Sequence, residues 1–205
     1  MCELIINMIV STELERELVL KLVKDFTKEY NSSNIAKEVG KTRVGTFKAL
    51  KALEQKQLVT SKVLGKARFY KFNLASPFAR KSVELLLMDE ANKHQRWIEE
   101  FKEIFETVNV AILFGSIINR RNANDIDLML VYPIDSNDRV NSYVAAKNEM
   151  MTKKIHLLKQ TKEDLMKNLK NKDAVIIDVI RNGIVLHGCE ELVELMRCVT
   201  GQEQG

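Results

Sequence analysis

The sequence predicts a two-domain chain, an α+β part followed by an α/β part, with a long linking helix between them. Three observations predict it. Residues 1–76 hold helical segments with apolar residues three and four apart, followed by two strand-like segments. Helix formers dominate residues 77–108, after the boundary that Pro77 marks. In residues 109–205, apolar strands alternate with helical segments, which is typical of a sheet flanked by helices, here expected on one face.

The first domain has three helix starts, each marked by a hydroxyl side chain. Thr12 and Glu15 have the spacing of a capping box, which predicts a first helix there. Ser33 is expected to cap a second, short helix that Gly40 ends, and Thr42 is expected to cap a third. The third helix is expected to face the core with four apolar residues: Val44, Phe47, Leu50 and Leu53.

Residues 58–63 and 68–74 have strand character and flank a plausible turn, so they are expected to form a hairpin. The order of helix, helix-turn-helix and hairpin resembles the winged helix-turn-helix of bacterial and archaeal transcription regulators. The resemblance depends on the segment from Asn34 to Val59, NIAKEVGKTRVGTFKALKALEQKQLV. It implies that double-stranded DNA is a partner of the first domain.

The third helix and the hairpin carry the side chains that this resemblance places on DNA. A recognition helix needs donors on its outer side for base edges, and a hairpin tip needs cations for phosphates. The expected DNA-binding residues are Lys41, Thr42, Arg43, Thr46, Lys48, Lys62, Lys66 and Arg68. Tyr70 is expected to pack the hairpin. The alternative is a domain used for protein–protein contact or dimerisation.

The net charge of +4 is unevenly distributed. Residues 1–76 hold 14 Lys and Arg against 8 Asp and Glu, a net charge of +6, whereas the remainder holds 18 against 20, a net charge of −2. This asymmetry favours a polyanionic partner for the first domain, although a solvated basic surface is the alternative.

Residues 77–108 are expected to form one long linking helix, or two helices broken near Asp89. Apolar residues on this segment recur at spacings of three and four, which predicts one buried stripe, either in a core or in a homodimer interface. The stripe consists of Trp97, Phe101, Ile104, Phe105 and Val108.

The segment from Val110 to Val131, VAILFGSIINRRNANDIDLMLV, carries the most specific motif. An apolar strand leads into a Gly-Ser pair, and a second apolar strand holds Asp125 and Asp127. Because residues two apart in a strand point to the same side, the two carboxylates lie together. Their repulsion favours a cation, and paired carboxylates suit Mg²⁺ bound with nucleotide phosphates.

This motif resembles the signature of the nucleotidyltransferase superfamily of DNA polymerase beta type, and the resemblance covers about residues 106 to 188. It is closest to the minimal nucleotidyltransferases, including those paired with helical partner proteins as antitoxins. The resemblance implies that Gly115 and Ser116 hold the triphosphate of an NTP, expected to be ATP, and that Asp125 and Asp127 ligate Mg²⁺. Arg120 or Arg121 is expected to neutralise phosphate charge.

Two features depart from that family. The spacer between the Gly-Ser pair and the first aspartate has eight residues, fewer than is usual there. The family also places a third carboxylate on a later strand, and the matching position here holds His156. Histidine serves as a general base near neutral pH but is a poor substitute for a carboxylate on Mg²⁺. The alternative is that His156 is a half-buried strand residue without a role.

Three hypotheses follow. The chain is a Mg²⁺-dependent nucleotidyltransferase that transfers a nucleotidyl group to a hydroxyl and also binds DNA. Alternatively, it is a transcription regulator whose nucleotidyltransferase fold is a catalytically silent nucleotide sensor or dimerisation domain. The third hypothesis is an antitoxin-like protein that binds a helical protein partner. A homodimer is expected under the first two, because short winged helices usually bind near-palindromic sites as dimers.

Composition excludes several other classes. No stretch reaches the ~18 apolar residues of a membrane span. Cys2, Cys189 and Cys198 are odd in number and widely spaced, so neither a disulfide framework nor a zinc site is indicated, and a cytoplasmic location is expected.

Overall fold

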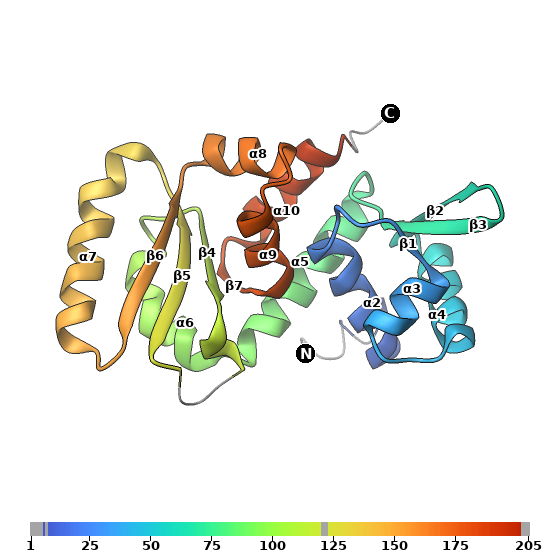
Figure 1. Cartoon of the computed structure of the whole chain (residues 1–205), viewed down its shortest axis with the longest axis horizontal. Helices are drawn as coiled ribbons and strands as arrows, with labels where there is room; N and C mark the ends of the chain where they lie inside the picture. The colour runs from blue at the N-terminus through green and yellow to red at the C-terminus, as the bar shows by residue number, and fades with distance from the viewer. Residues whose placement is uncertain (1–5, 7, 120–122, 202–205) are drawn as a thin grey trace. The chain divides into compact units, whose positions relative to one another are not determined.

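The computed structural model describes residues 6, 8–119 and 123–201 (Figure 1). The chain divides into two compact units. The first runs to Leu86 and includes the chain from Thr200 onwards, and the second runs from Leu87 to Val199. The boundary lies inside helix α5 (Pro77–Asn92), so this helix belongs to both units. Among the described residues, no helix is long and apolar enough to cross a membrane.

Helix α2 (Glu13–Lys24) begins at the predicted capping box. The Thr12 hydroxyl accepts a hydrogen bond from the Glu15 N–H at 3.1 Å. The Glu15 carboxylate in turn accepts from the Ser11 N–H at 2.8 Å, so two donors that a helix start leaves unpaired are satisfied. Lys56 Nζ lies 2.8 Å from this carboxylate, and the ion pair joins the start of α2 to the end of α4 (Arg43–Gln55).

Asn31, and not Ser33, caps helix α3 (Ser32–Glu38). Its side-chain oxygen accepts from the N–H groups of Ser33 and Asn34, at 2.9 and 3.0 Å. Asn34 completes the capping box by accepting from the Asn31 N–H at 2.8 Å. The helix therefore starts earlier than predicted, with Ser33 in its first turn. Asn31 and Asn34 are three residues apart, the spacing at which each side chain accepts a hydrogen bond from the other residue's backbone N–H.

The first unit has the arrangement of a winged helix-turn-helix, as predicted. Helices α3 and α4 form the helix-turn-helix, and the Thr42 hydroxyl caps α4. Strands β2 (Val59–Leu64) and β3 (Ala67–Phe72) form the predicted hairpin, and β3 also pairs with the short strand β1 (Tyr30–Asn31), which sequence reasoning missed. Tyr70 is buried in this hairpin, as expected.

The linking segment forms two helices. α5 ends at Asn92, and α6 (Gln95–Phe101) follows, continued by a 3-10 turn at Lys102–Ile104. The break lies a few residues beyond the predicted one. Trp97, Phe101, Ile104 and Val108 are buried in the core of the second unit. The stripe is therefore part of a core, and the alternative that these residues form a homodimer interface is wrong.

The second unit is built on a mixed four-stranded sheet in the order β6-β5-β4-β7. β5 pairs antiparallel with β4 and parallel with β6, and β4 pairs antiparallel with β7. The strands are β4 (Val110–Phe114), β5 (Asp125–Val131), β6 (Lys154–Gln160) and β7 (Ile184–His187). The parallel pairing places His156 directly opposite Asp127.

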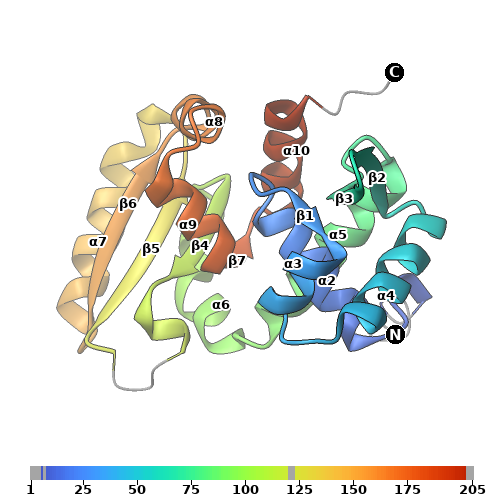
Figure 2. The ribbon, with the colours of Figure 1, turned by 45° about the vertical axis from the view of Figure 1, so that its right-hand side comes forward.

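Helices cover both faces of this sheet, and the prediction of one covered face is wrong (Figure 2). α6 and α7 (Asn137–Met150) pack on the face that holds Leu113, Ile126 and Leu128. The opposite side is covered by α8 (Lys162–Lys170) and α9 (Ala174–Asn182). A last helix, α10 (Cys189–Thr200), was not predicted. Local sequence patterns define each helix, but which face it covers depends on contacts between distant segments.

Candidate functional site

The exposed face of α4 differs from the one predicted. Thr46, expected on DNA, is fully buried, whereas Val44 and Phe47, expected in the core, are 65% and 46% exposed. At 100° per residue, residues spaced strictly three apart shift around the helix by 60° at each step. After three such steps, Val44 and Leu53 lie on opposite sides of the helix. The face that packs on the unit follows the helical spacing of three and four: Thr46, Ala49, Leu50 and Leu53.

The predicted DNA-binding cations fall into two groups. Arg43 and Lys48 on α4, and Lys62 and Lys66 on the hairpin, are exposed and form no ion pair with any residue that the structure describes. Lys41 and Arg68 are exposed but face carboxylates. Lys41 Nζ lies 3.8 Å from Glu17, and the Arg68 guanidinium lies 3.6 Å from Glu54 and donates to the Ser61 hydroxyl at 3.0 Å. Thr42 serves as the N-cap of α4.

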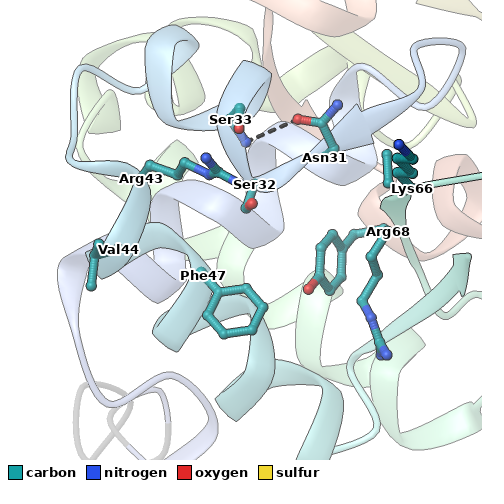
Figure 3. A pocket seen from close by; sticks show the side chains of 10 residues that line it. Asn31, Ser32, Ser33, Arg43, Val44, Phe47, Lys66 and Arg68 are labelled. Carbon is teal, nitrogen blue, oxygen red and sulfur yellow. Dashed lines mark hydrogen bonds between the residues drawn. The ribbon is translucent and has the colours of Figure 1, made fainter.

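A cleft of about 540 Å³ opens between the start of α3, the start of α4 and strand β3 (Figure 3). Figure 3 shows the Phe47 ring on one side and the Arg68 and Lys66 side chains across from it, with the Arg43 side chain directed toward Ser32. Among the residues that the structure describes, no acidic side chain lines the cleft, so its surface combines cations with exposed apolar groups. The lining residues are Asn31, Ser32, Ser33, Arg43, Val44, Phe47, Lys66, Ala67, Arg68 and Tyr70.

Sequence reasoning missed the apolar part of this surface. Val44 and Phe47 lie among cations, yet they were assigned to the core because they are apolar and precede Leu50 at a spacing of three. The available signal was the alternative set that includes Ala49 and Leu50, which fits the helical period better.

The second candidate site lies where β5 and β6 begin. Asp125 and Asp127 point to the same side of the sheet, as predicted, and His156 lies beside both. The His156 Nε2 atom is 3.8 Å from Asp125 Oδ1, and its Nδ1 atom is 3.5 Å from Asp127 Oδ1. The side chains of the three residues are 47%, 28% and 61% exposed, respectively, so the group is open to a ligand from solvent.

The turn after β4 is fitted closely to Asp127. Gly115 has a φ of +77°, a conformation that favours glycine. A Cβ atom at this position would lie 2.0 Å from Asp127 Oδ2, so no other residue fits without moving the carboxylate. Ser116 begins a 3-10 turn, and both Gly115 and Ser116 are exposed. Arg120 and Arg121 lie outside the described residues.

These side chains alone do not fit a resident magnesium ion. Mg²⁺ requires oxygen ligands in near-octahedral geometry, and the third donor here is an imidazole nitrogen. Within residues 6, 8–119 and 123–201, no three His, Cys, Asp or Glu side chains are arranged to hold a metal ion. Two carboxylates are the set that Mg²⁺ uses together with nucleotide phosphates.

No protein-family model matches the chain, and no curated protein matches it. Two solved structures are distantly similar. A cysteine-to-serine mutant of ZitR from Lactococcus lactis is 12% identical, with 68% of this chain and 74% of that chain covered and a TM-score of 0.32. The adhesin competence repressor AdcR from Streptococcus pyogenes is 10% identical, with 69% and 80% covered and a TM-score of 0.30. At these scores the two structures do not indicate what this chain binds.

Proposed function

We propose that this chain is a transcription regulator that binds double-stranded DNA with its first unit. In this proposal α4 enters the major groove and the β2–β3 hairpin contacts the phosphate backbone, as a helix-turn-helix recognition helix and its flanking elements do. The supporting observation is a set of four exposed cations on these two elements without a carboxylate partner among the described residues: Arg43, Lys48, Lys62 and Lys66.

Other cations of the same unit differ from these four because they form ion pairs with carboxylates. Lys56 pairs with Glu15 and Lys71 pairs with Glu29, each at 2.8 Å. Ion pairs therefore neutralise these two lysines, whereas Arg43, Lys48, Lys62 and Lys66 keep their positive charge. An α-helix fits the major groove of DNA, so unpaired cations on α4 and the hairpin favour a polyanionic partner. Each phosphate that a cation neutralises releases counterions from the DNA.

Salt dependence of DNA binding tests the proposal. Short duplexes are selected from a random library by the full chain, and fluorescence anisotropy gives the dissociation constant over a series of salt concentrations. Lys62→Ala and Lys66→Ala are each expected to lower the slope of log K against log salt by about 0.9 if the lysine contacts one phosphate. Lys102→Ala is the matched control, because Lys102 forms an exposed ion pair with Glu99 in the second unit.

A slope that is unchanged in both hairpin variants, or a failure to select any duplex, would contradict the proposal. The chain would then fit the alternative of a domain for protein–protein contact. Loss of slope in Lys102→Ala alone would move the DNA contact to the second unit.

We propose that the regulator acts as a homodimer on near-palindromic sites, because two-fold sites match two recognition helices. The stripe that includes Trp97 and Phe101 is internal, so the interface lies elsewhere. Phe78 and Met88 on α5 are more than half exposed and are the apolar side chains that this helix offers to a second copy. Light scattering at micromolar concentration tests the dimer, and Phe78→Glu is expected to give a monomer.

For the second unit we propose nucleotide binding, with ATP and Mg²⁺ as the expected ligand. The supporting observation is the close fit between the Gly115 turn and Asp127, which places an exposed glycine–serine turn beside a pair of carboxylates. Because His156 occupies the position expected for a third carboxylate, binding without turnover is favoured over nucleotidyl transfer. The second unit would then act as a nucleotide sensor for the DNA-binding unit.

Calorimetry with ATP and Mg²⁺, and incubation with each of the four labelled nucleoside triphosphates and cell extract, test this second proposal. Binding that Asp127→Ala abolishes, without transfer of label, is the expected result. Label transferred by the unmodified chain and not by Asp127→Ala would establish an enzyme instead. Absence of both would mean that the fold is retained without a nucleotide.

A further inference from the structure

Two apolar side chains project from the part of α4 that the proposed function places in the major groove. Val44 is 65% exposed and Phe47 is 46% exposed. Three residues apart, they lie on the same side of the helix, separated by a rise of about 4.5 Å. The exposure of an aromatic ring on a recognition helix is costly in water unless a partner covers it.

The surroundings of these side chains define what that partner is. Arg43 and Lys48 adjoin them on α4, and Lys66 lies across the cleft from Phe47, while none of the described residues that line that cleft is acidic. An apolar pair within a ring of cations matches a polyanion that exposes apolar groups of its own. In duplex DNA the apolar group of the major groove is the 5-methyl group of thymine. In RNA duplexes the major groove is too deep and narrow for side chains, and uracil has no such methyl group.

We propose that Val44 and Phe47 contact thymine methyl groups in the major groove and so set the sequence preference of this chain. The rise between them is close to the spacing of neighbouring bases, ~3.4 Å along one strand, so the pair covers one or two successive base pairs. Arg43, at the start of the same helix, is placed for a neighbouring guanine, the base that arginine contacts most often. The preferred half-site therefore contains adjacent thymines beside a guanine. This inference depends on the proposed function of the first unit.

Substitution of deoxyuridine for thymine tests the contact, because it removes the methyl group and nothing else. Each thymine of a duplex selected by the full chain is replaced singly, and anisotropy gives the affinity ratio between the thymine and uracil duplexes. A ratio of about four is expected at each contacted position, since burying one methylene-sized group changes a binding constant by about that factor. Phe47→Ala is expected to reduce this ratio to about one at one position, and Val44→Ala at a neighbouring position.

Val63→Ala is the matched control, because Val63 is an exposed apolar residue of the same unit but lies on the hairpin. It is expected to keep the thymine-to-uracil ratios of the unmodified chain. Circular dichroism of each variant confirms that the exposed substitution leaves the fold intact.

Equal affinity for the thymine and uracil duplexes would overturn the methyl contact while leaving the proposed DNA binding in place. Ratios that persist in both Phe47→Ala and Val44→Ala would overturn it as well. If the chain binds neither duplex, the proposed function fails and the methyl contact fails with it.

Discussion

Replacing Thr46 by valine is expected to stabilise the first unit, although sequence reasoning placed this residue on DNA. The Thr46 side chain is fully buried, and its hydroxyl oxygen has no hydrogen-bond partner among the residues that the structure describes. A buried hydroxyl without a partner costs about 1–3 kcal/mol. Valine has nearly the same shape and a similar helix propensity, so no comparable loss offsets the gain. The free energy of unfolding is expected to rise by about 1 kcal/mol.

Thermal unfolding followed by circular dichroism measures this gain, which corresponds to a rise in Tm of about 4–8 °C for a unit of this size. Thr46→Ser is the matched control, because it keeps the hydroxyl and removes a buried methyl group, so it should lower the Tm. DNA affinity should not change in Thr46→Val. A lower Tm, or weaker DNA binding at an unchanged Tm, would refute the assignment of Thr46 to the buried face of α4.

Three further predictions concern buried or strained groups. Tyr30→Phe removes a hydroxyl that donates to the buried Asp25 carboxylate at 2.6 Å, so urea unfolding should show a loss of about 1.5–3 kcal/mol; an unchanged midpoint would contradict this. Burial lowers the pKa of His187 below its ordinary value of 6.5. The free energy of unfolding should therefore be constant above pH 6.5 and fall as the pH drops from 6.5 to the folded-state pKa. Thermal melts at a series of pH values should show a weaker dependence in His187→Phe. Gly115→Ala should cost the second unit at least about 1 kcal/mol and displace Asp127, and an unaltered melt with normal ATP binding would count against the fitted turn.

Local features of the structure were predictable from the sequence because their causes lie within a few residues. The capping box at Thr12, the N-cap at Thr42 and the hairpin turn each involve side chains and backbone groups four residues apart or fewer. The pairing of Asp125 with Asp127 was equally local, since it follows from the two-residue period of a strand.

Other features depend on geometry that the sequence pattern expresses only weakly. The buried face of α4 was misassigned because a spacing of three resembles the helical period over two steps and departs from it over three. The coverage of both sheet faces depends on how α8 and α9 return past β6 and β4, which is a contact between distant segments. The sequence matched His156 to the family's third-carboxylate position, but its place opposite Asp127 and its two nitrogen-to-oxygen distances required the sheet register.

Substitution within the aspartate pair of β5 tests whether the second unit has a ligand site there. Asp125 and Asp127 carry like charges on the same side of β5, and the repulsion between them is unfavourable without a bound cation. Asp127→Asn keeps the shape of the side chain and removes one charge, so it should raise the ligand-free Tm reported by the fluorescence of Trp97, the single tryptophan. It should also abolish stabilisation by ATP and Mg²⁺, worth about 2.7 kcal/mol at a ligand concentration of 100 Kd.

Asp178→Asn is the control for this last prediction, because Asp178 is an exposed aspartate on α9 that accepts a hydrogen bond from Asn182. It should alter neither the ligand-free Tm by more than a small amount nor the response to nucleotide. If Asp127→Asn instead lowers the ligand-free Tm, the carboxylate stabilises the fold through His156 and is not held in reserve for a ligand. A binding site retains charges whose removal would stabilise the ligand-free fold. Asp127→Asn therefore distinguishes a binding site, for which the Tm rises, from a purely structural pair, for which the Tm falls.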